Sequence, residues 1–286
     1  MACSKEHGLS SGFHDAHSNT YDQMASNCTL NIAKQFVKDL PLPITNDSHI
    51  LDNACGTGLV TLLLKQTYPN LSPKIHGSDI APNMLEIYTS RAKEHEWSNI
   101  STSVEDVMDL KGLKDDTFTH VFTNFGIMAG PSSPDSKGPL RAVKEIYRVT
   151  RKGGVAVTTT WWKRGFDVAM EKTTGRVKPG EKAFSFGSNG EWETGRYLMG
   201  MMEDAGFKRE GMSVKCVKGA ISARSLEELV ENNMLFKDIA YKGYSEEELG
   251  QVRVILAEEL QKLEVYKKTD DGVEVEQWAW IGVGFK

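Results

Sequence analysis

Segments with the pattern of buried strands alternate with segments of helical periodicity over residues 49–161, and this alternation constrains the fold more than any other feature. The expected strands are 49–54, 74–79, 100–104, 119–124 and 155–161, and the expected helices are 59–68, 83–95 and 139–150. Strands separated by helices form parallel sheets that are covered on both faces. With right-handed crossovers, the sequence predicts an α/β fold with a doubly wound, mostly parallel, Rossmann-like sheet and helices on both faces.

The flanking segments are less regular. Residues 1–18 are rich in Ser, His and Gly and predict a flexible lead-in, and a helix is expected from about Tyr21 to Leu40. After Trp162 we expect a long loop or partial helix at 163–190, helices at 191–206, 225–237 and 245–266, and strands at 212–217 and 273–283. We therefore expect residues 19–286 to form a single domain with a helical insertion at roughly 163–270 near the C-terminus.

Composition excludes several classes of protein. With 286 residues, 40% hydrophobic and 26% charged, the chain is an ordinary globular protein. A net charge of −5 argues against a nucleic-acid partner. The four cysteines and seven histidines show none of the spacings of metal sites, so no metal is expected. The opening residues carry no apolar signal core and no stretch is long enough to cross a membrane, which predicts a cytoplasmic protein without a membrane partner.

The segment Ile50–Gly58 carries the strongest functional signal. A buried strand ends at Asp52, and Gly56 and Gly58 then turn the chain into a helix. Glycines let the backbone approach a ligand closely, and ligands bind at the carboxyl ends of such strands. The dinucleotide fingerprint requires a third glycine where Thr61 stands, and an acidic residue disfavours a pyrophosphate. The order favours S-adenosylmethionine (SAM), which has an ammonium group and no phosphate, over a nicotinamide cofactor.

Three further signals follow the next strands. Asp79 ends the second strand, about 20 residues after the glycine turn, where an acidic side chain reaches ribose hydroxyls; it could also cap the helix that begins near Pro82. Asp106 and Val107 follow the third strand and could read the edge of an adenine, although Asp106 could equally be a solvated turn residue. Asn124-Phe125 ends the fourth strand, beside the expected position of a reacting methyl group.

These motifs resemble a known family. The matching pieces are Leu51–Gly56, Met84–Glu86 with Glu94–Trp97, Thr119–Phe122, Phe125-Gly126 and Thr160-Trp161. Over about residues 20–162 the chain resembles class I SAM-dependent methyltransferases. More narrowly, it is similar to a fungal secondary-metabolism group that includes the gliotoxin bis-thiomethyltransferase.

The resemblance implies roles for the matching positions. SAM would be the cofactor and S-adenosylhomocysteine the product, with no metal. The implied cofactor-binding residues are Tyr21, Asp52, Asn53, Ala54, Gly56, Gly58, Asp79, Ile80, Met84, Asp106, Val107, Asn124 and Phe125. Asp52 and the backbone of 53–58 would face the methionine part of SAM, and Tyr21 would close over the cofactor.

The acceptor side is less determined by the sequence. The expected substrate-binding residues are Met128, Trp161, Trp162 and Phe166, although these aromatic side chains could equally pack the insertion. No catalytic base is recognised, which favours a thiol acceptor because a few per cent of a thiol is already ionised near neutral pH. The sequence thus predicts methyl transfer to a small natural product, most readily a thiol of a reduced dithiol diketopiperazine. The alternatives are O- or N-methylation of another small metabolite, or a SAM-binding regulatory protein.

Overall fold

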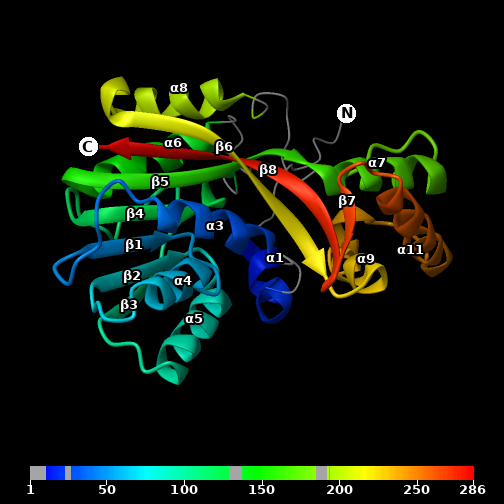
Figure 1. The fold of residues 1–286 in the computed structure, drawn as a ribbon, viewed down its shortest axis with the longest axis horizontal. Helices are drawn as coiled ribbons and strands as arrows, with labels where there is room; N and C mark the ends of the chain where they lie inside the picture. Colours follow the sequence, from blue (N-terminus) through cyan, green and yellow to red (C-terminus); the bar gives the residue numbers. More distant parts are fainter. Residues whose placement is uncertain (1–10, 23–26, 129–136, 185–191, 193) are drawn as a thin grey trace.

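The computed structural model describes residues 11–22, 27–128, 137–184, 192 and 194–286. Within them the centre is an eight-stranded sheet of order β3-β2-β1-β4-β5-β8-β6, in which β7 pairs with β8 (Figure 1). β3, β2, β1, β4 and β5 are parallel, and β8 runs antiparallel to β5 and β6. The strands are β1 His49–Asn53, β2 Lys74–Asp79, β3 Ile100–Val104, β4 Phe118–Asn124, β5 Thr150–Arg164, β6 Met212–Ala223, β7 Tyr266–Thr269 and β8 Gly272–Phe285. The predicted α/β fold with a mostly parallel Rossmann-like sheet is confirmed.

Helices cover both faces of this sheet. One hydrophobic core lies under α3, α4, α7, α9 and α11, and a second lies between the sheet and α6 and α8. The helices are α1 Ser11–Ala16, α3 Cys28–Lys38, α4 Leu59–Thr67, α5 Pro82–Glu94, α6 Gly138–Val149, α7 Gly165–Val177, α8 Gly195–Ala205, α9 Leu226–Met234, α10 Lys237–Ala240 and α11 Glu246–Gln261, with short 3-10 turns η1 Ser18–Thr20 and η4 Arg209–Gly211. Each described helix is too short or too polar to cross a membrane.

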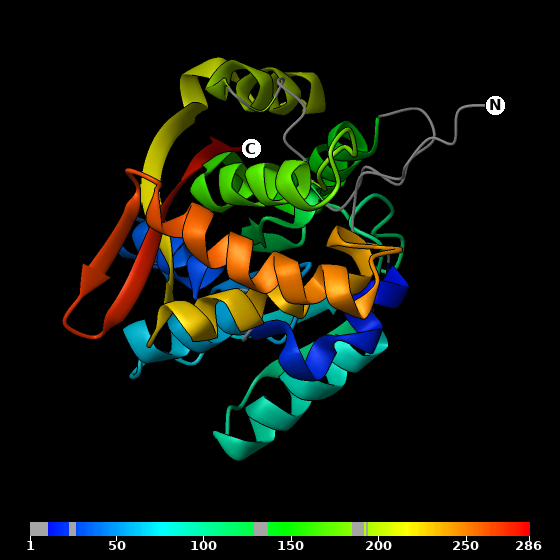
Figure 2. The same ribbon diagram turned by 90° about the vertical axis from the view of Figure 1, so that its right-hand side faces the viewer.

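Three long strands carry the second half of the molecule. β5 has 15 residues, β6 has 12 and β8 has 14, whereas β1 has five. They extend beyond the ends of the shorter parallel strands, and α7, α9 and α11 pack together on this extension (Figures 1 and 2). The carboxyl edge of the parallel strands therefore faces the helical part, and a bound small molecule at this edge would lie between the two.

Several elements differ from the sequence prediction. α7 forms where a loop or partial helix was expected, because Phe166, Ala169, Met170 and Thr173 repeat at helical spacing and are all buried, despite the glycines around them. The last predicted helix was expected to end at residue 266, but α11 ends at Gln261. The unpredicted strand β7 then begins at Tyr266. Short helical turns at 11–16 and 18–20 replace part of the expected flexible lead-in, and residues 1–10 lie outside the described part.

Candidate functional site

The turn after β1 is built from left-handed backbone. Ala54, Gly56 and Gly58 have φ of 51°, 53° and 85°. A side chain at Gly58 would meet the ring of Tyr88 at 2.2 Å, so glycine lets α5 pack closely against this turn. The sequence therefore folds into the predicted strand–turn–helix at the carboxyl edge of the sheet, where Ala54 and Gly56 are half-buried.

Asp52 holds this turn from behind. Its Oδ2 accepts hydrogen bonds from the N–H of Thr61 at 3.1 Å and from the Thr61 hydroxyl at 2.8 Å, and that hydroxyl also pairs with the hydroxyl of Tyr88. The residue is only 1% exposed, and burial raises the pKa of its carboxyl to about 7. Oδ2 of this carboxylate fastens the first turn of α4, and the role of Asp52 toward the methionine part of SAM stays a prediction.

Asn53 is also turned inward. It is 1% exposed, its Nδ2 donates to the Thr123 hydroxyl at 3.1 Å and its Oδ1 accepts from the Ser78 hydroxyl at 3.1 Å. The side chain thus ties β1 to β2 and β4. Only the backbone of Asn53 stays available to a ligand, as the sequence implied.

Asp79 and Ile80 form the part of the site that matches expectation most closely. Asp79 Oδ2 accepts the N–H of Gly56 at 2.8 Å, and Oδ1 accepts the N–H of Ala81 at 3.0 Å. Burial raises the pKa of this carboxyl, while the backbone N–H groups and the charge of His14 oppose the rise. Ile80 follows directly after β2 with 42% of its surface exposed. A carboxylate with unused lone pairs beside an exposed apolar side chain fits a ribose that carries a flat base.

The residues expected around an adenine are only partly exposed. Asp106 Oδ1 accepts the N–H of Met108 at 2.8 Å, so this carboxylate shapes the turn after β3. Val107 is 9% exposed and belongs to the core under α6 and α8, and Met84 is 1% exposed in the first turn of α5. The structure therefore corrects the roles of Val107 and Met84, whose side chains lie in the interior.

The end of β4 is strained and tightly held. Phe125 has a φ of 62°, its N–H donates to the Thr159 hydroxyl at 2.9 Å, and that hydroxyl donates to Asn124 Oδ1 at 2.8 Å. The ring of Phe125 stacks on Trp161 with centroids 3.9 Å apart. A bulky residue in the left-handed region costs about 1–3 kcal/mol and is common at functional sites. The geometry fixes the ring of Phe125 at the carboxyl edge.

The two tryptophans of β5 point to opposite faces. Trp161 belongs to the core under α3 and α7, and its backbone N–H donates to Met128 Sδ at 3.1 Å. The ring centroid of Trp162 lies 5.7 Å from that of Trp280, which packs toward α8. Phe166 is 3% exposed within the first core. Trp161 and Met128 therefore border the carboxyl edge. Phe166 packs in the first core and Trp162 is half-buried against Trp280, and their roles toward a substrate stay predictions.

The segment 11–22 lies across the glycine turn. An atom of the Tyr21 ring lies 3.9 Å from where a Cβ of Gly56 would stand, and burial and Asp79 raise the pKa of the Tyr21 hydroxyl. Asp22 accepts from the Thr57 hydroxyl at 2.6 Å and pairs with Arg91 at 2.8 Å. The Tyr21 ring thus lies over the glycine turn, and its closure over a cofactor stays a prediction.

Asp15 fastens the same segment to α5. It accepts the N–H of Asn83 at 2.8 Å, which gives α5 the cap that Ala81 cannot supply. The sequence analysis missed Asp15, Asp22 and Arg91, because their contacts join segments that are distant in the chain.

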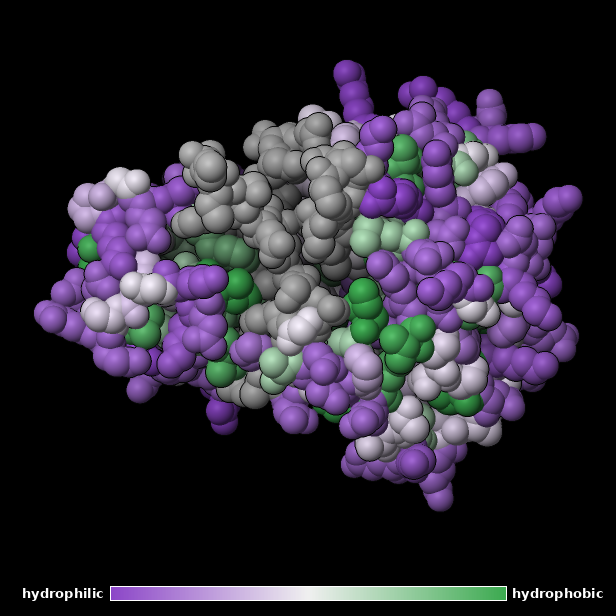
Figure 3. All heavy atoms as spheres, turned by 180° about the vertical axis from the view of Figure 1, so that it is seen from behind, coloured by the Kyte–Doolittle hydropathy of each residue, from purple (hydrophilic) through white to green (hydrophobic). Residues whose placement is uncertain are grey.

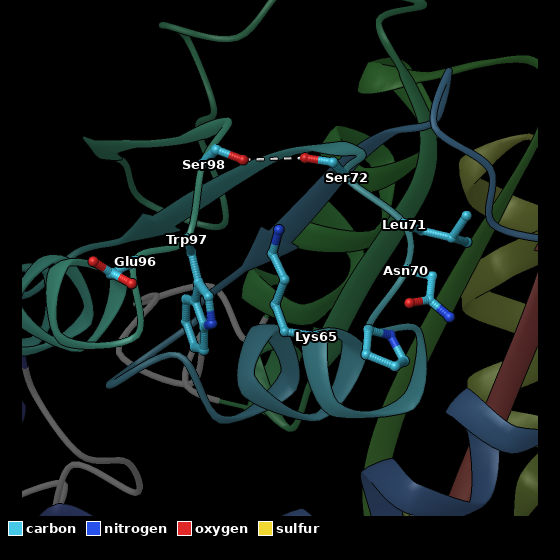
Figure 4. A pocket seen from close by; sticks show the side chains of 8 residues that line it. Lys65, Asn70, Leu71, Ser72, Glu96, Trp97 and Ser98 are labelled. Carbon is cyan, nitrogen blue, oxygen red and sulfur yellow. Dashed lines mark hydrogen bonds between the residues drawn. The ribbon is translucent and has the colours of Figure 1, made fainter.

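One surface cavity lies elsewhere. Figure 4 shows a hollow of about 310 Å³ at the amino ends of β2 and β3, where the hydroxyls of Ser72 and Ser98 are 3.1 Å apart and Lys65 and Trp97 form the sides. None of the predicted site residues lines it.

The face opposite to that of Figure 1 is hydrophilic at both ends, and hydrophobic side chains gather near its middle (Figure 3). In the described part of the chain, no three His, Cys, Asp or Glu side chains group as metal ligands.

Comparison with known proteins agrees with this architecture. Residues 50–154 match the family model described as "Methyltransferase domain". Methyltransferase tpcH of Aspergillus fumigatus is 29% identical over 167 residues, which are 55% of this chain and 56% of that protein. The acetylaranotin bis-thiomethyltransferase of Aspergillus terreus is 23% identical over 190 residues, covering 64% of this chain and 62% of that protein. The chain thus spans less than two thirds of the length of these relatives.

Solved structures share the fold at low identity. A phosphoethanolamine N-methyltransferase of Haemonchus contortus, solved with S-adenosylhomocysteine, superposes with a TM-score of 0.55 at 16% identity, covering 96% of this chain and 58% of that one. This likeness concerns the fold alone. Together with the matched domain, it fits the arrangement of β1 to β5 around the carboxyl edge.

Proposed function

We propose that this chain, a class I SAM-dependent methyltransferase related to the fungal secondary-metabolism group, transfers a methyl group from SAM to a small-molecule natural product. The observation that carries the proposal is the convergence at one edge of Asp79, the exposed Ile80, the left-handed turn at Gly56 and the covering ring of Tyr21. The edge belongs to the part of the chain that matches the methyltransferase domain.

The residues present fit SAM. Asp79 would accept hydrogen bonds from the ribose hydroxyls, Ile80 would lie against the adenine, and the backbone of 54–58 would face the methionine part. Asn124 and Phe125 would border the reacting end. SAM supplies an activated methyl group on a sulfonium that is already a good leaving group, so the protein has to align the acceptor at about 3–3.5 Å and exclude water.

The proposed acceptor is a thiol of a reduced dithiol diketopiperazine. The similarity to a protein named as a bis-thiomethyltransferase supports it at 23% identity. A thiol also needs little help in losing its proton. We further propose that the protein acts in the cytosol without a membrane partner. Its net charge of −5 argues against a nucleic-acid partner.

Two measurements test the proposal in order. Calorimetric titration with SAM should show binding, and mass spectrometry should then detect a product heavier by one methylene unit from a panel of thiols, phenols and amines that includes a reduced dithiol diketopiperazine. A methylated oxygen or nitrogen would replace the thiol by the alternative acceptors. Binding of SAM without any product would favour a regulatory SAM-binding protein, and absence of SAM binding would refute the cofactor assignment.

A further inference from the structure

A charged side chain stands beside the ring pair at the carboxyl edge. The guanidinium of Arg164, the last residue of β5, lies 5.4 Å from the centroid of the Trp161 ring, which stacks on Phe125. The same guanidinium lowers the pKa of the Tyr21 hydroxyl and the Cys28 thiol, although burial raises both more strongly. Arg164 therefore stands beside the ring pair at the carboxyl edge and within electrostatic range of Tyr21 and Cys28.

Asp167 faces this guanidinium without a hydrogen bond. Its Oδ1 lies 3.6 Å from Arg164 Nη1, which is close enough for an ion pair and too far for a hydrogen bond. The side chain is 16% exposed, and Oδ1 is buried with no hydrogen-bond partner in the described part of the chain. A buried acceptor without a hydrogen bond is unfavourable and rare in folded proteins. We therefore expect Asp167 Oδ1 to accept a hydrogen bond from a bound molecule.

Gln277 provides a second unused group on the other side of Arg164. Its Oε1 accepts from Arg164 Nε at 3.2 Å, which fixes the orientation of the amide, and its Nε2 is left without a described partner. The residue is 0% exposed. Val275, Gln277 and Ala279 are two residues apart along β8, so their side chains point to the same face of the sheet. Val275 and Ala279 belong to the same core as Trp161, which places Gln277 on the Trp161 face. Arg164 thus contacts two buried side chains, and among the described residues neither Asp167 Oδ1 nor Gln277 Nε2 has a hydrogen-bond partner.

We propose that Asp167 is the base that takes the proton of the methyl acceptor, and that Gln277 donates a hydrogen bond to an oxygen of the same molecule; this rests on the proposed methyltransferase function. The proton of the acceptor's O–H or S–H passes to Asp167 Oδ1. The electron pair of that oxygen or sulfur forms the bond to the methyl carbon, the carbon–sulfonium bond breaks, and its pair stays on the sulfur. Asp167 then releases the proton to water.

The electrostatics of the pair suit this role. Burial raises the pKa of Asp167, which makes its carboxylate a stronger base than an exposed one, and the charge of Arg164 opposes the rise and keeps the ionised form available. A purely structural role is the competing explanation, since Asp167 lies in the first turn of α7 where a negative charge favours a helix. That role would leave the choice of acceptor unaffected.

Two probes that differ only in the reacting atom separate these explanations. 4-Methylphenol loses its proton near pH 10, whereas 4-methylbenzenethiol is largely ionised near neutral pH, so a base matters more for the phenol. With SAM, Asp167→Asn should lower methylation of 4-methylphenol about 100-fold or more and that of 4-methylbenzenethiol about tenfold or less. The loss for the thiol should shrink as the pH rises. Equal losses for both probes at every pH would overturn the assignment of Asp167 as a base.

Binding supplies a readout that does not depend on turnover. Calorimetry with 4-methylphenol, in the presence of S-adenosylhomocysteine, should show affinity about tenfold lower for Asp167→Asn and several-fold lower for Gln277→Leu. Asp116→Asn, a surface carboxylate paired with Lys286, is the matched control and should bind as the wild type does. Two results would refute this acceptor site while the cofactor assignment stands. One is that Asp167→Asn binds 4-methylphenol as tightly as the wild type, and the other is that the wild type binds S-adenosylhomocysteine but not 4-methylphenol. Loss of S-adenosylhomocysteine binding by the wild type would instead contradict the proposed function.

Discussion

Replacing Asp79 by asparagine tests the cofactor site most directly. A carboxylate offers about four lone-pair positions, and the N–H groups of Gly56 and Ala81 use two of them. The N–H of Ile80 also interacts with this carboxylate, and the acceptor capacity that is left can serve a ribose hydroxyl. Asparagine keeps one oxygen and presents an NH₂ group to the other donors, so at least one charge-assisted bond to ribose is lost.

The loss can be expressed as an affinity. A hydrogen bond to a charged group contributes about 1.5–3 kcal/mol, which corresponds to about a tenfold to hundredfold rise in the Kd for SAM. Calorimetric titration with SAM at constant pH measures this ratio. The same substitution unpairs a backbone N–H at the turn, so thermal unfolding has to show that the variant is folded at the temperature of the titration.

Asp116→Asn is again the control, because Asp116 lies just before β4, at the edge of the sheet opposite to the carboxyl edge. It should leave the Kd for SAM unchanged. If folded Asp79→Asn bound SAM within a factor of two of the wild type, the ribose contact would not exist and the reasoning from the end of β2 would be refuted.

Three further changes should have measurable effects. Gly58→Ala places a Cβ at φ 85° and 2.2 Å from the Tyr88 ring, and we expect the free energy of unfolding in urea to fall by about 2–5 kcal/mol. Asp22→Asn removes the 2.8 Å pair with Arg91, so the amides of residues 11–22 should exchange hydrogen faster and SAM should dissociate faster in stopped-flow experiments. Burial raises the pKa of Asp52 to about 7 from 3.8, so the folded state binds its proton more tightly than the unfolded state. The free energy of unfolding should therefore fall as the pH rises from about 4 to about 7, and Asp52→Asn should remove that slope.

Each of these expectations has a clear contrary outcome. Gly200→Ala, in α8 with open space around it, should be neutral or slightly stabilising; equal destabilisation at both glycines would contradict the packing argument. Unchanged exchange in Asp22→Asn would show that the ion pair does not hold the covering segment. Equal pH slopes in the wild type and Asp52→Asn would mean that Asp52 keeps an ordinary pKa in the folded protein.

The sequence predicts the parts of the fold whose cause is local. β2 and β3 have the predicted bounds because each is a short run between clear turns. Asp79 could be found because its place at the end of β2 and the next residues already define its surroundings. At 163–190 the sequence predicts either a loop or a partial helix, because the helical spacing of apolar residues is interrupted by glycine and threonine; packing against α11 accompanies the helix that forms, α7.

Contacts between distant segments could not be predicted. Arg164 and Gln277 are 113 positions apart and meet only because β5 and β8 pair in register. Asp15 reaches Asn83 across 68 positions to cap α5. Nothing in the local pattern around these residues distinguishes them from ordinary surface polar residues, so the acceptor side remained without a base until the strands were paired.

Asp52 shows how one residue of a motif can hold the local structure and also indicate a ligand class. Thr61 argues against a dinucleotide because it occupies the place of the third glycine, and the same residue determines the orientation of Asp52. Its N–H and hydroxyl lie one helical turn into α4 and both donate to Asp52 Oδ2. A glycine at position 61 would offer only the N–H, so one of the two hydrogen bonds that orient the Asp52 carboxylate would be absent. Thr61 therefore bears on the expected ligand class and also on the orientation of Asp52, whose Oδ2 it engages, whereas the carboxylate of Asp79 lies at the end of β2.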